Sequence, residues 1–312
     1  LFLTYSLLLA MGTGALFVVP MSIVAKWFER KRGLALGITS AGCGLGPVFM
    51  APFATYLIVS LDWRMAYLVM GLMAWLILIP LSRFLRKDPY EIGLLPDGVK
   101  ASSSESGLEE RVSRPSGLSL LQALRTRSFW LIAPVWLLWA AIVFLTNTHI
   151  VPHATDIGFS VVEAALILSL MNGAAVVGRL LLGVASDRLG RKRTTAVCAL
   201  FQCVAMLWLL WSQDLWMLYL FAVVYGFGWG GMSTTMAALI ADTFGVGKLG
   251  IIFGVLEIGF GVGAAIGPLV GGFIFDISGS YFGAFLVGTV TMLVVTLLVV
   301  PVRREADRGL VS

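Results

Sequence analysis

Nine long apolar stretches constrain this chain of 312 residues more than any other feature of its sequence. A helix needs about 20 apolar residues to cross a hydrocarbon core of about 30 Å, and a strand edge would find no hydrogen-bond partner in lipid. The pattern therefore predicts an all-α integral membrane protein. The expected spans cover residues 1–25, 34–60, 65–85, 128–150, 161–183, 194–212, 215–241, 249–275 and 281–302.

Composition excludes several other classes of protein. Hydrophobic residues make up 59% and charged residues only 12% of the chain, which is more apolar than a soluble domain of this size. The net charge of +5 comes from short basic clusters between the spans, so we expect no nucleic-acid partner. Neither metal-ligand spacing nor a paired nucleophile and base is found. We therefore expect no metal, no cofactor and no enzymatic activity, with a lipid bilayer as the surroundings.

The distribution of Lys and Arg predicts the orientation in the membrane. These residues fall on one side of the expected spans, except for Arg64 on the other side and Arg179 within a span. Cytoplasmic loops carry the excess of positive charge, so this side is assigned to the cytoplasm. We expect a multi-pass protein of the plasma (inner) membrane with a cytoplasmic C-terminus. The first span starts at Leu1 without a flanking charge, which favours a chain that lacks an N-terminal part.

An internal repeat supports that interpretation. Residues Lys31, Gly33, Gly37, Gly42, Gly44 and Gly46 recur 217 positions later as Lys248, Gly250, Gly254, Gly259, Gly261 and Gly263. Spans one to three therefore correspond to spans seven to nine, as in parallel halves of a transporter, while spans four to six have no counterpart. The expected parent has twelve helices, of which nine are present: the last three of the first half and all six of the second.

The spans divide the chain into four predicted parts. Residues 1–86 form a partial N-terminal helical half, with helices four to six of the parent. Residues 87–127 form a cytoplasmic linker, in which the polar stretch 102–107 is expected to be disordered and residues 118–127 to contain a short interfacial helix. Residues 128–302 form the C-terminal six-helix half, and residues 303–312 form a cytoplasmic tail.

One loop between two spans carries a specific motif. Residues 183–193 read Gly-Val-Ala-Ser-Asp-Arg-Leu-Gly-Arg-Lys-Arg. The carboxylate of Asp187 can accept bonds from Arg191 or from the N-terminus of a neighbouring helix. The run resembles the loop signature of the major facilitator superfamily, and the matching residues are Gly183, Asp187, Arg188, Gly190, Arg191 and Lys192. The resemblance implies the major facilitator fold, and the bonds available to Asp187 predict a loop that can act as a latch. The alternative is a loop that serves only as a positively charged anchor.

Two further stretches narrow the resemblance. Residues 27–38 and 152–158, together with the Gly178-Arg179 pair, are similar to the monocarboxylate transporter and oxalate/formate antiporter branch. This similarity implies a secondary active transporter of small organic anions that works by alternating access, coupled to protons or to exchange with a counter-anion. An exporter of another class, for drugs or sugars, and an inactive fragment are the alternatives. The chain has Ala175 where mammalian members carry Asp, and Glu257 where oxalate exchangers carry Lys, so the substrate and the coupling ion stay open.

Candidate site residues follow from polar groups within the spans. The resemblance implies that Arg179 meets the carboxylate of the substrate, because a guanidinium forms two parallel bonds with it; the alternative is a side chain that extends to the headgroups or latches the inner gate. Asn147 and Asn172 contact the substrate or bond other helices. Tyr225 and Trp229 line the cavity or pack in the core.

Two residues are candidates for proton coupling. Glu257 is the only carboxylate deep within a span, where it can exchange protons or pair with Arg179. A neutral Glu257 bonded to a neighbouring helix is the alternative. His149, at the expected outer end of the fourth span, can relay protons or can simply be solvated.

Overall fold

The computed structural model describes residues 9–92, 94–98 and 117–303. Within these residues, each of the nine expected stretches contains a helix, because a helix satisfies its backbone groups internally. The helices are α1 (Leu9–Trp27), α2 (Arg32–Leu61), α3 (Trp63–Phe84), α6 (Arg127–Asp156), α7 (Val161–Leu189), α8 (Arg191–Leu209), α9 (Leu215–Phe244), α10 (Leu249–Ser278) and α11 (Phe282–Val299).

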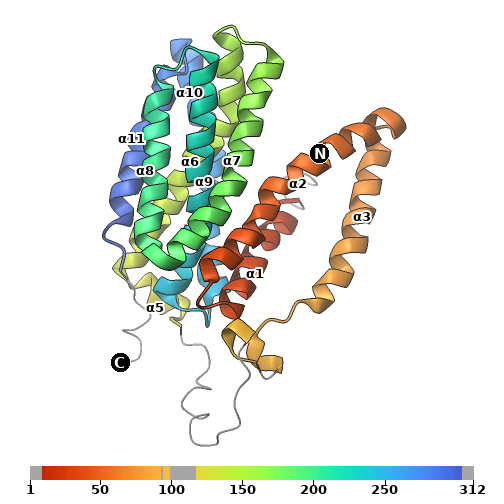
Figure 1. The fold of residues 1–312 in the computed structure, drawn as a ribbon, viewed down its shortest axis with the longest axis vertical. Helices are drawn as coiled ribbons and strands as arrows, with labels where there is room; N and C mark the ends of the chain where they lie inside the picture. Colours follow the sequence, from red (N-terminus) through yellow and green to blue (C-terminus); the bar gives the residue numbers. More distant parts are fainter. Residues whose placement is uncertain (1–8, 93, 99–116, 304–312) are drawn as a thin grey trace, which may run out of the picture.

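Six of the described helices are long and apolar enough to cross a membrane on their own. These are α3, α6, α7, α9, α10 and α11. Successive helices alternate in direction, so the connections α1–α2, α7–α8 and α9–α10 lie at the same end of the molecule as the linker (Figure 1). We call this end the linker end and the opposite one the far end. The all-helical class predicted for the chain is confirmed for the part that the structure describes.

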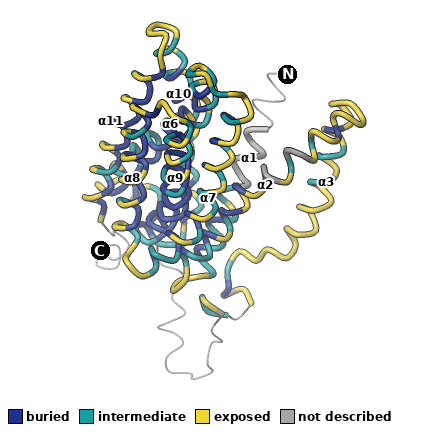
Figure 2. Tube along the Cα trace, turned by 45° about the horizontal axis from the view of Figure 1, so that its top comes forward, coloured by how far each residue is buried: buried dark blue, intermediate teal, exposed yellow. Residues whose placement is uncertain are grey.

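Helices α6 to α11 form a bundle. Helix α7 packs along α9, α6 packs along α10, and α8 lies between α9 and α11. Buried positions gather in its interior (Figure 2). The large side chains that are buried include Trp136 and Trp139 of α6 and Phe221 and Tyr225 of α9. Van der Waals packing of these rings holds the helices together, since lipid offers no hydrophobic driving force between them.

The first three helices contact this bundle through α1 and α2. Helix α2 packs on α7 and α9, and α1 packs on α2 and α10. Helix α3 packs mainly on α2, and only 6% of its most apolar window is buried (Figure 2). An exposed apolar helix of this length is stable in lipid and not in water.

The linker is attached to both parts of the molecule. After α3 it forms two short 3-10 turns at Pro89–Ile92 and Pro96–Gly98, and it ends in the short helix α5 (Leu120–Leu124). The short helix expected within residues 118–127 is therefore present, with a capping box between Ser119 and Gln122. The stretch 102–107 and residues 304–312 of the tail lie outside the described residues.

Two equivalent turns anchor the linker. The amides of Glu29 and Arg30, between α1 and α2, donate hydrogen bonds of 3.3 and 3.1 Å to the carboxylate of Asp97. The amide of Leu118 donates to the carbonyl of Phe244, at the end of α9, over 2.9 Å. These turns occupy the same place in the sequence repeat. Their last residues share one backbone conformation, with φ −112° and ψ 31° at residue 31 and φ −118° and ψ 26° at residue 248.

Candidate functional site

Arg179 lies inside the molecule, and Nε and Nη1 of its guanidinium find no hydrogen-bond partner among the residues that the structure describes. The residue is only 5% exposed. Burial of a cation without a partner costs on the order of several kcal/mol, as for charged side chains within membranes. Nε and Nη1 therefore keep N–H groups that no described residue uses.

Two helices shape the space around this guanidinium. Its Cζ lies 5.4 Å from the centroid of the Trp229 ring on α9, a cation–π arrangement. On α2, a Cβ added to Gly44 would lie 2.6 Å from Nη1 of Arg179 and 2.6 Å from Cγ2 of Val176, so a larger residue there would require these side chains to move. Since α2 belongs to the first three helices and α9 to the bundle, the site lies where these two parts meet.

The two asparagines bond to their own helices. The Nδ2 atom of Asn147 donates to the carbonyl of Val143 over 2.8 Å, and that of Asn172 donates to Leu168 over 2.9 Å. Both donors thus fold back by one helical turn, and neither of these bonds joins two helices. Half-buried side chains of this kind keep their carbonyl oxygens as acceptors.

Tyr225 and Trp229 occupy different surroundings, although they lie one turn apart on α9. Tyr225 is fully buried, stacks on Phe221 at 5.2 Å between centroids, and donates to the carbonyl of Ile142 over 3.4 Å. Trp229 instead faces Arg179. The structure thus brings Trp229 to the candidate site and leaves Tyr225 in the core of the bundle.

Glu257 bonds to a neighbouring helix. Nε1 of Trp136 on α6 donates a hydrogen bond of 3.2 Å to Oε1 of Glu257 on α10. Among the described residues no ion pair joins Glu257 to Arg179, so the pairing considered from the sequence is not found. The side chain is half-buried, next to a cluster of rings that includes Phe253 and Phe260.

His149 is placed differently from the sequence-based expectation. The helix continues to Asp156, so His149 lies inside α6 and not at its end. The residue is 9% exposed, and its Nε2 donates to the carbonyl of Pro268 on α10 over 2.9 Å. The solvated alternative is therefore wrong. The physical reason is that α6 runs past the predicted boundary to Asp156, with Pro152 inside the helix, so His149 packs against α10 instead of ending the span.

The signature loop joins α7 to α2. The carboxylate of Asp187 accepts hydrogen bonds from the amides of Gly33 and Leu34 in the first turn of α2, over 2.9 and 3.1 Å, and it pairs with Arg191. Both interactions considered for Asp187 are thus present. Gly183 is in close contact with α2, since a Cβ there would lie 2.6 Å from the carbonyl of Gly33.

The remaining residues of the loop turn the chain and face outwards. Gly190 has φ +92°, in the region that favours glycine, and this turn separates α7 from α8. Arg188 and Lys192 are exposed. Their positions suit contact with headgroups at the linker end.

Asp242 completes a charge network that the sequence analysis missed. At the end of α9, its carboxylate pairs with Arg32 of α2 and accepts from Nε of Arg191 over 3.2 Å. A little deeper, the hydroxyls of Ser40 on α2 and Thr234 on α9 lie 3.0 Å apart. These contacts close the linker end between α2 and the bundle. The sequence feature that could have indicated this network is an acidic residue at the end of a helix, on the side where the loops are otherwise basic.

Comparison with known proteins finds membrane transporters that are similar to this chain over most of its length. Human monocarboxylate transporter 12 is 25% identical over 320 residues, covering 94% of this chain and 60% of that protein. The uncharacterized transporter YhjX of Escherichia coli strain K12 is 25% identical over 270 residues, covering 85% of this chain and 63% of that protein. The chain thus spans about 60% of the length of these relatives.

Solved structures and a family model agree on the fold. The fucose:proton symporter of E. coli superposes with a TM-score of 0.68 at 18% identity, covering 93% of this chain and 74% of that structure. The human organic anion transporter MFSD10 gives a TM-score of 0.68 at 18% identity, covering 91% of this chain and 67% of that structure. The model named Major Facilitator Superfamily matches residues 1–184 and 150–311. This chain belongs to the Major Facilitator Superfamily of membrane transporters.

Proposed function

We propose that this protein is a secondary active transporter of small organic anions of the monocarboxylate class. The observation that carries the proposal is the guanidinium of Arg179, which is buried between two parts of the fold and whose Nε and Nη1 have no hydrogen-bond partner among the described residues. The similarity to monocarboxylate transporter 12 supports the same substrate class. We place the protein in the plasma (inner) membrane with the linker end and the C-terminus in the cytoplasm, since that end carries the basic loops.

The chemistry of Arg179 favours a carboxylate over a neutral solute. A guanidinium presents parallel N–H groups that match the two oxygens of a carboxylate. In an apolar environment this pairing is stronger than in water, because little solvent screens it. Trp229 covers one side of the guanidinium, and an apolar substituent of the anion would pack against that ring. A neutral sugar gains no comparable energy from a buried cation.

Alternating access follows from the position of the site. Arg179 belongs to α7 and faces α2 across the contact between the two parts. Rocking of one part against the other would expose the site to one side of the membrane at a time. In this structure the linker end is closed by the Asp187 and Asp242 contacts. An anion that reaches Arg179 from the far end would be released at the linker end after those contacts break.

Glu257 is the candidate for coupling to protons. It lies inside α10, and it is held by Trp136 on the neighbouring helix. Protonation of this group on one side of the membrane and its release on the other would link anion movement to a proton gradient. Without such coupling, the same site would exchange one anion for another.

Uptake of labelled L-lactate into proteoliposomes tests the proposal. We expect the Arg179→Ala variant to lose at least about 95% of carboxylate uptake, and Arg179→Lys to retain a small fraction, because an ammonium cannot form the paired bonds. The exposed Arg193→Ala variant, which removes the same charge from the linker end, serves as the control and keeps its uptake. A monodisperse elution profile shows that each variant folds. Normal lactate uptake by Arg179→Ala would overturn the proposal.

A further inference from the structure

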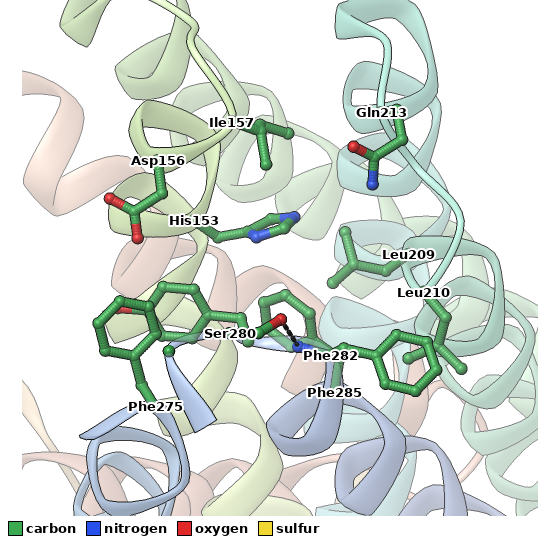
Figure 3. Close-up of a pocket in the computed structure, with 12 residues that line it drawn as sticks. His153, Asp156, Ile157, Leu209, Leu210, Gln213, Phe275, Ser280, Phe282 and Phe285 are labelled. Carbon is green, nitrogen blue, oxygen red and sulfur yellow. Dashed lines mark hydrogen bonds between the residues drawn. The ribbon is translucent and has the colours of Figure 1, made fainter. Parts of the chain in front are cut away.

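A second pocket lies at the far end of the bundle, away from Arg179. Its volume is about 360 Å³, within the range of small-molecule sites. It opens between the end of α6, the connection from α8 to α9 and the connection from α10 to α11 (Figure 3). None of the residues discussed for the anion site lines it.

Stacked aromatic rings form one wall of this pocket. Phe275 and Tyr281 stack with centroids 4.4 Å apart, and Tyr281 and Phe285 stack at 5.9 Å. Phe282 lies at the mouth and is half exposed. Rings that already pack against one another lose little freedom when a ligand binds. Their faces attract cations and apolar groups.

His153 places an unsatisfied nitrogen in this pocket. Its ring stands edge-on to Tyr281 and Phe285, at interplanar angles of 85° and 84°. Its Nε2 is buried and has no hydrogen-bond partner among the described residues. Figure 3 shows the ring reaching into the middle of the pocket, with Gln213 on the opposite wall and Asp156 at the side. A ligand that donates hydrogen bonds would satisfy Nε2 of His153, and the exposed side-chain oxygens of Gln213 and Asp156 could accept from the same ligand.

The charge around this pocket is negative. Between residues 128 and 302, all of which the structure describes, every Lys and Arg other than Arg179 lies at the linker end. In the same range, the charged side chains at the far end are all acidic: Asp156, Glu163, Asp214 and Asp276. Asp156 itself lines the pocket. A bound anion would be repelled here, whereas a cation would be attracted.

We propose that this pocket binds a small organic cation: an ammonium group with an aromatic or alkyl body. The ammonium donates to Asp156, Gln213 and His153, and the body packs on the rings of Phe282 and Tyr281. Two sources share this chemistry, namely a free amine in the outer medium and the ethanolamine headgroup of a membrane lipid. The proposal concerns a site of opposite polarity to Arg179 and does not depend on the transport activity.

A series of probes of equal size tests the charge preference. Phenethylamine, 2-phenylethanol and 3-phenylpropionate carry positive, zero and negative charge, respectively, on similar bodies. Binding to the purified protein is measured by saturation-transfer NMR in nanodiscs of phosphatidylglycerol. We expect phenethylamine to bind with a dissociation constant of about 1 mM, and the other two at least about fivefold more weakly. Equal or tighter binding of the anion at this pocket, or no binding of the amine at about 10 mM, would overturn the proposal.

Two variants assign the binding to this pocket. Asp156→Asn removes the charge with little change of shape, and Phe282→Ala removes an exposed ring. We expect each to weaken phenethylamine binding about fivefold. The control is Asp214→Asn, which removes an acid from the same end of the molecule but outside the pocket, and it should change binding by less than about twofold. If neither pocket variant weakens binding, the amine binds elsewhere and the proposal is wrong.

The lipid composition distinguishes the two sources of the cation. In nanodiscs rich in phosphatidylethanolamine, a headgroup that occupies the pocket would compete with phenethylamine and weaken its apparent binding in the wild type only. If binding is the same in both lipids, the pocket takes the free amine. Both results support a cation site. Competition by phosphatidylethanolamine that persists in Asp156→Asn and Phe282→Ala would contradict it.

Discussion

The backbone amide of Gly33 donates a hydrogen bond of 2.9 Å to Oδ1 of Asp187, although the two residues lie 154 positions apart. The carboxylate caps the first turn of α2, where the free amides and the helix dipole favour a negative charge. One side chain of α7 thus holds the start of α2 against the bundle. Separation of the two parts at the linker end has to break this bond.

The first prediction concerns this cap. Asp187→Asn removes the charge and leaves one acceptor for two amides, which costs about 1–2 kcal/mol of the closed state. We expect the open population at the linker end to rise about 5- to 30-fold. Double electron–electron resonance between spin labels at the exposed positions Phe28 and Lys192 would report a longer and broader distance distribution. Asp214→Asn, at the far end, serves as the control, and an unchanged distribution in Asp187→Asn would contradict the prediction.

The second prediction concerns the ion pair of Arg32 and Asp242. Both side chains are partly shielded, with 11% and 30% exposure, so we expect a coupling energy of about 1 kcal/mol, near the upper end for exposed pairs. A double-mutant cycle with Arg32→Gln and Asp242→Asn, followed by unfolding in mixed micelles, measures this value. The matched cycle of Arg193→Gln with Asp242→Asn should give a value near zero. Equal coupling in both cycles would show that the contact has no specific energy.

The third prediction compares two glycines on α2. Gly44→Ala places a methyl group 2.6 Å from Nη1 of Arg179, whereas Gly42→Ala meets no atom within 4 Å. Both substitutions favour helix formation equally, so they differ in their contacts with the guanidinium and with Cγ2 of Val176, which the methyl group at residue 44 would also approach to 2.6 Å. We expect Gly44→Ala to raise the KM for a carboxylate at least about tenfold, as for the loss of a charge-assisted contact, while Gly42→Ala stays within about twofold. Equal kinetics in the two variants would argue against a site at Arg179.

The fourth prediction separates coupling from binding at Glu257. Glu257→Gln keeps an oxygen that can accept from Nε1 of Trp136 but cannot exchange a proton. We expect anion exchange across the vesicle membrane to stay within about twofold, because the anion site is intact. Accumulation driven by a pH gradient should be lost. The exposed linker variant Glu91→Gln is the control, and proton-driven accumulation that persists in Glu257→Gln would assign coupling to another group.

The fifth prediction concerns the start of the linker. The carboxylate of Asp97 accepts from the amides of Glu29 and Arg30, and Nε1 of Trp27 donates to the carbonyl of Arg86 over 3.0 Å. Asp97→Ala removes the first pair of bonds, at a cost of about 1 kcal/mol in this exposed setting. We therefore expect trypsin to cut after Arg86 about fivefold faster. Mass spectrometry of timed digests measures the rate, with Glu91→Ala as the control, and unchanged cleavage would contradict an anchoring role.

The local pattern predicted the helices well and their contacts poorly. The lengths of the apolar stretches located every described long helix, to within a few residues at most ends. The reason is that in lipid each segment has to satisfy its backbone hydrogen bonds internally. The same pattern ended the fourth span too early. That error left His149 at an interface, whereas the longer helix buries it against Pro268. Polar residues near helix ends do not by themselves tell whether a helix stops.

Side-chain partners depended on which helices become neighbours. Asp187 could be assigned to a helix terminus in general from its position in the loop, but the identity of that terminus, the first turn of α2, comes only from the packing of α2 on α7. Asp242 was missed because its partners, Arg32 and Arg191, lie on different helices. The spacing of residues within one segment of the sequence does not predict contacts among residues of three different helices.

The sequence by itself determined a helical membrane protein, its loops of positive charge and its internal repeat, since these depend on the free energy of each segment in lipid. Only the tertiary structure decided which polar groups are satisfied. It paired Glu257 with Trp136, and among the residues that it describes it left Nε and Nη1 of Arg179 without a hydrogen-bond partner. The physical reason is that a hydrogen bond between helices requires a particular crossing, and many residues far apart in the chain jointly set that crossing.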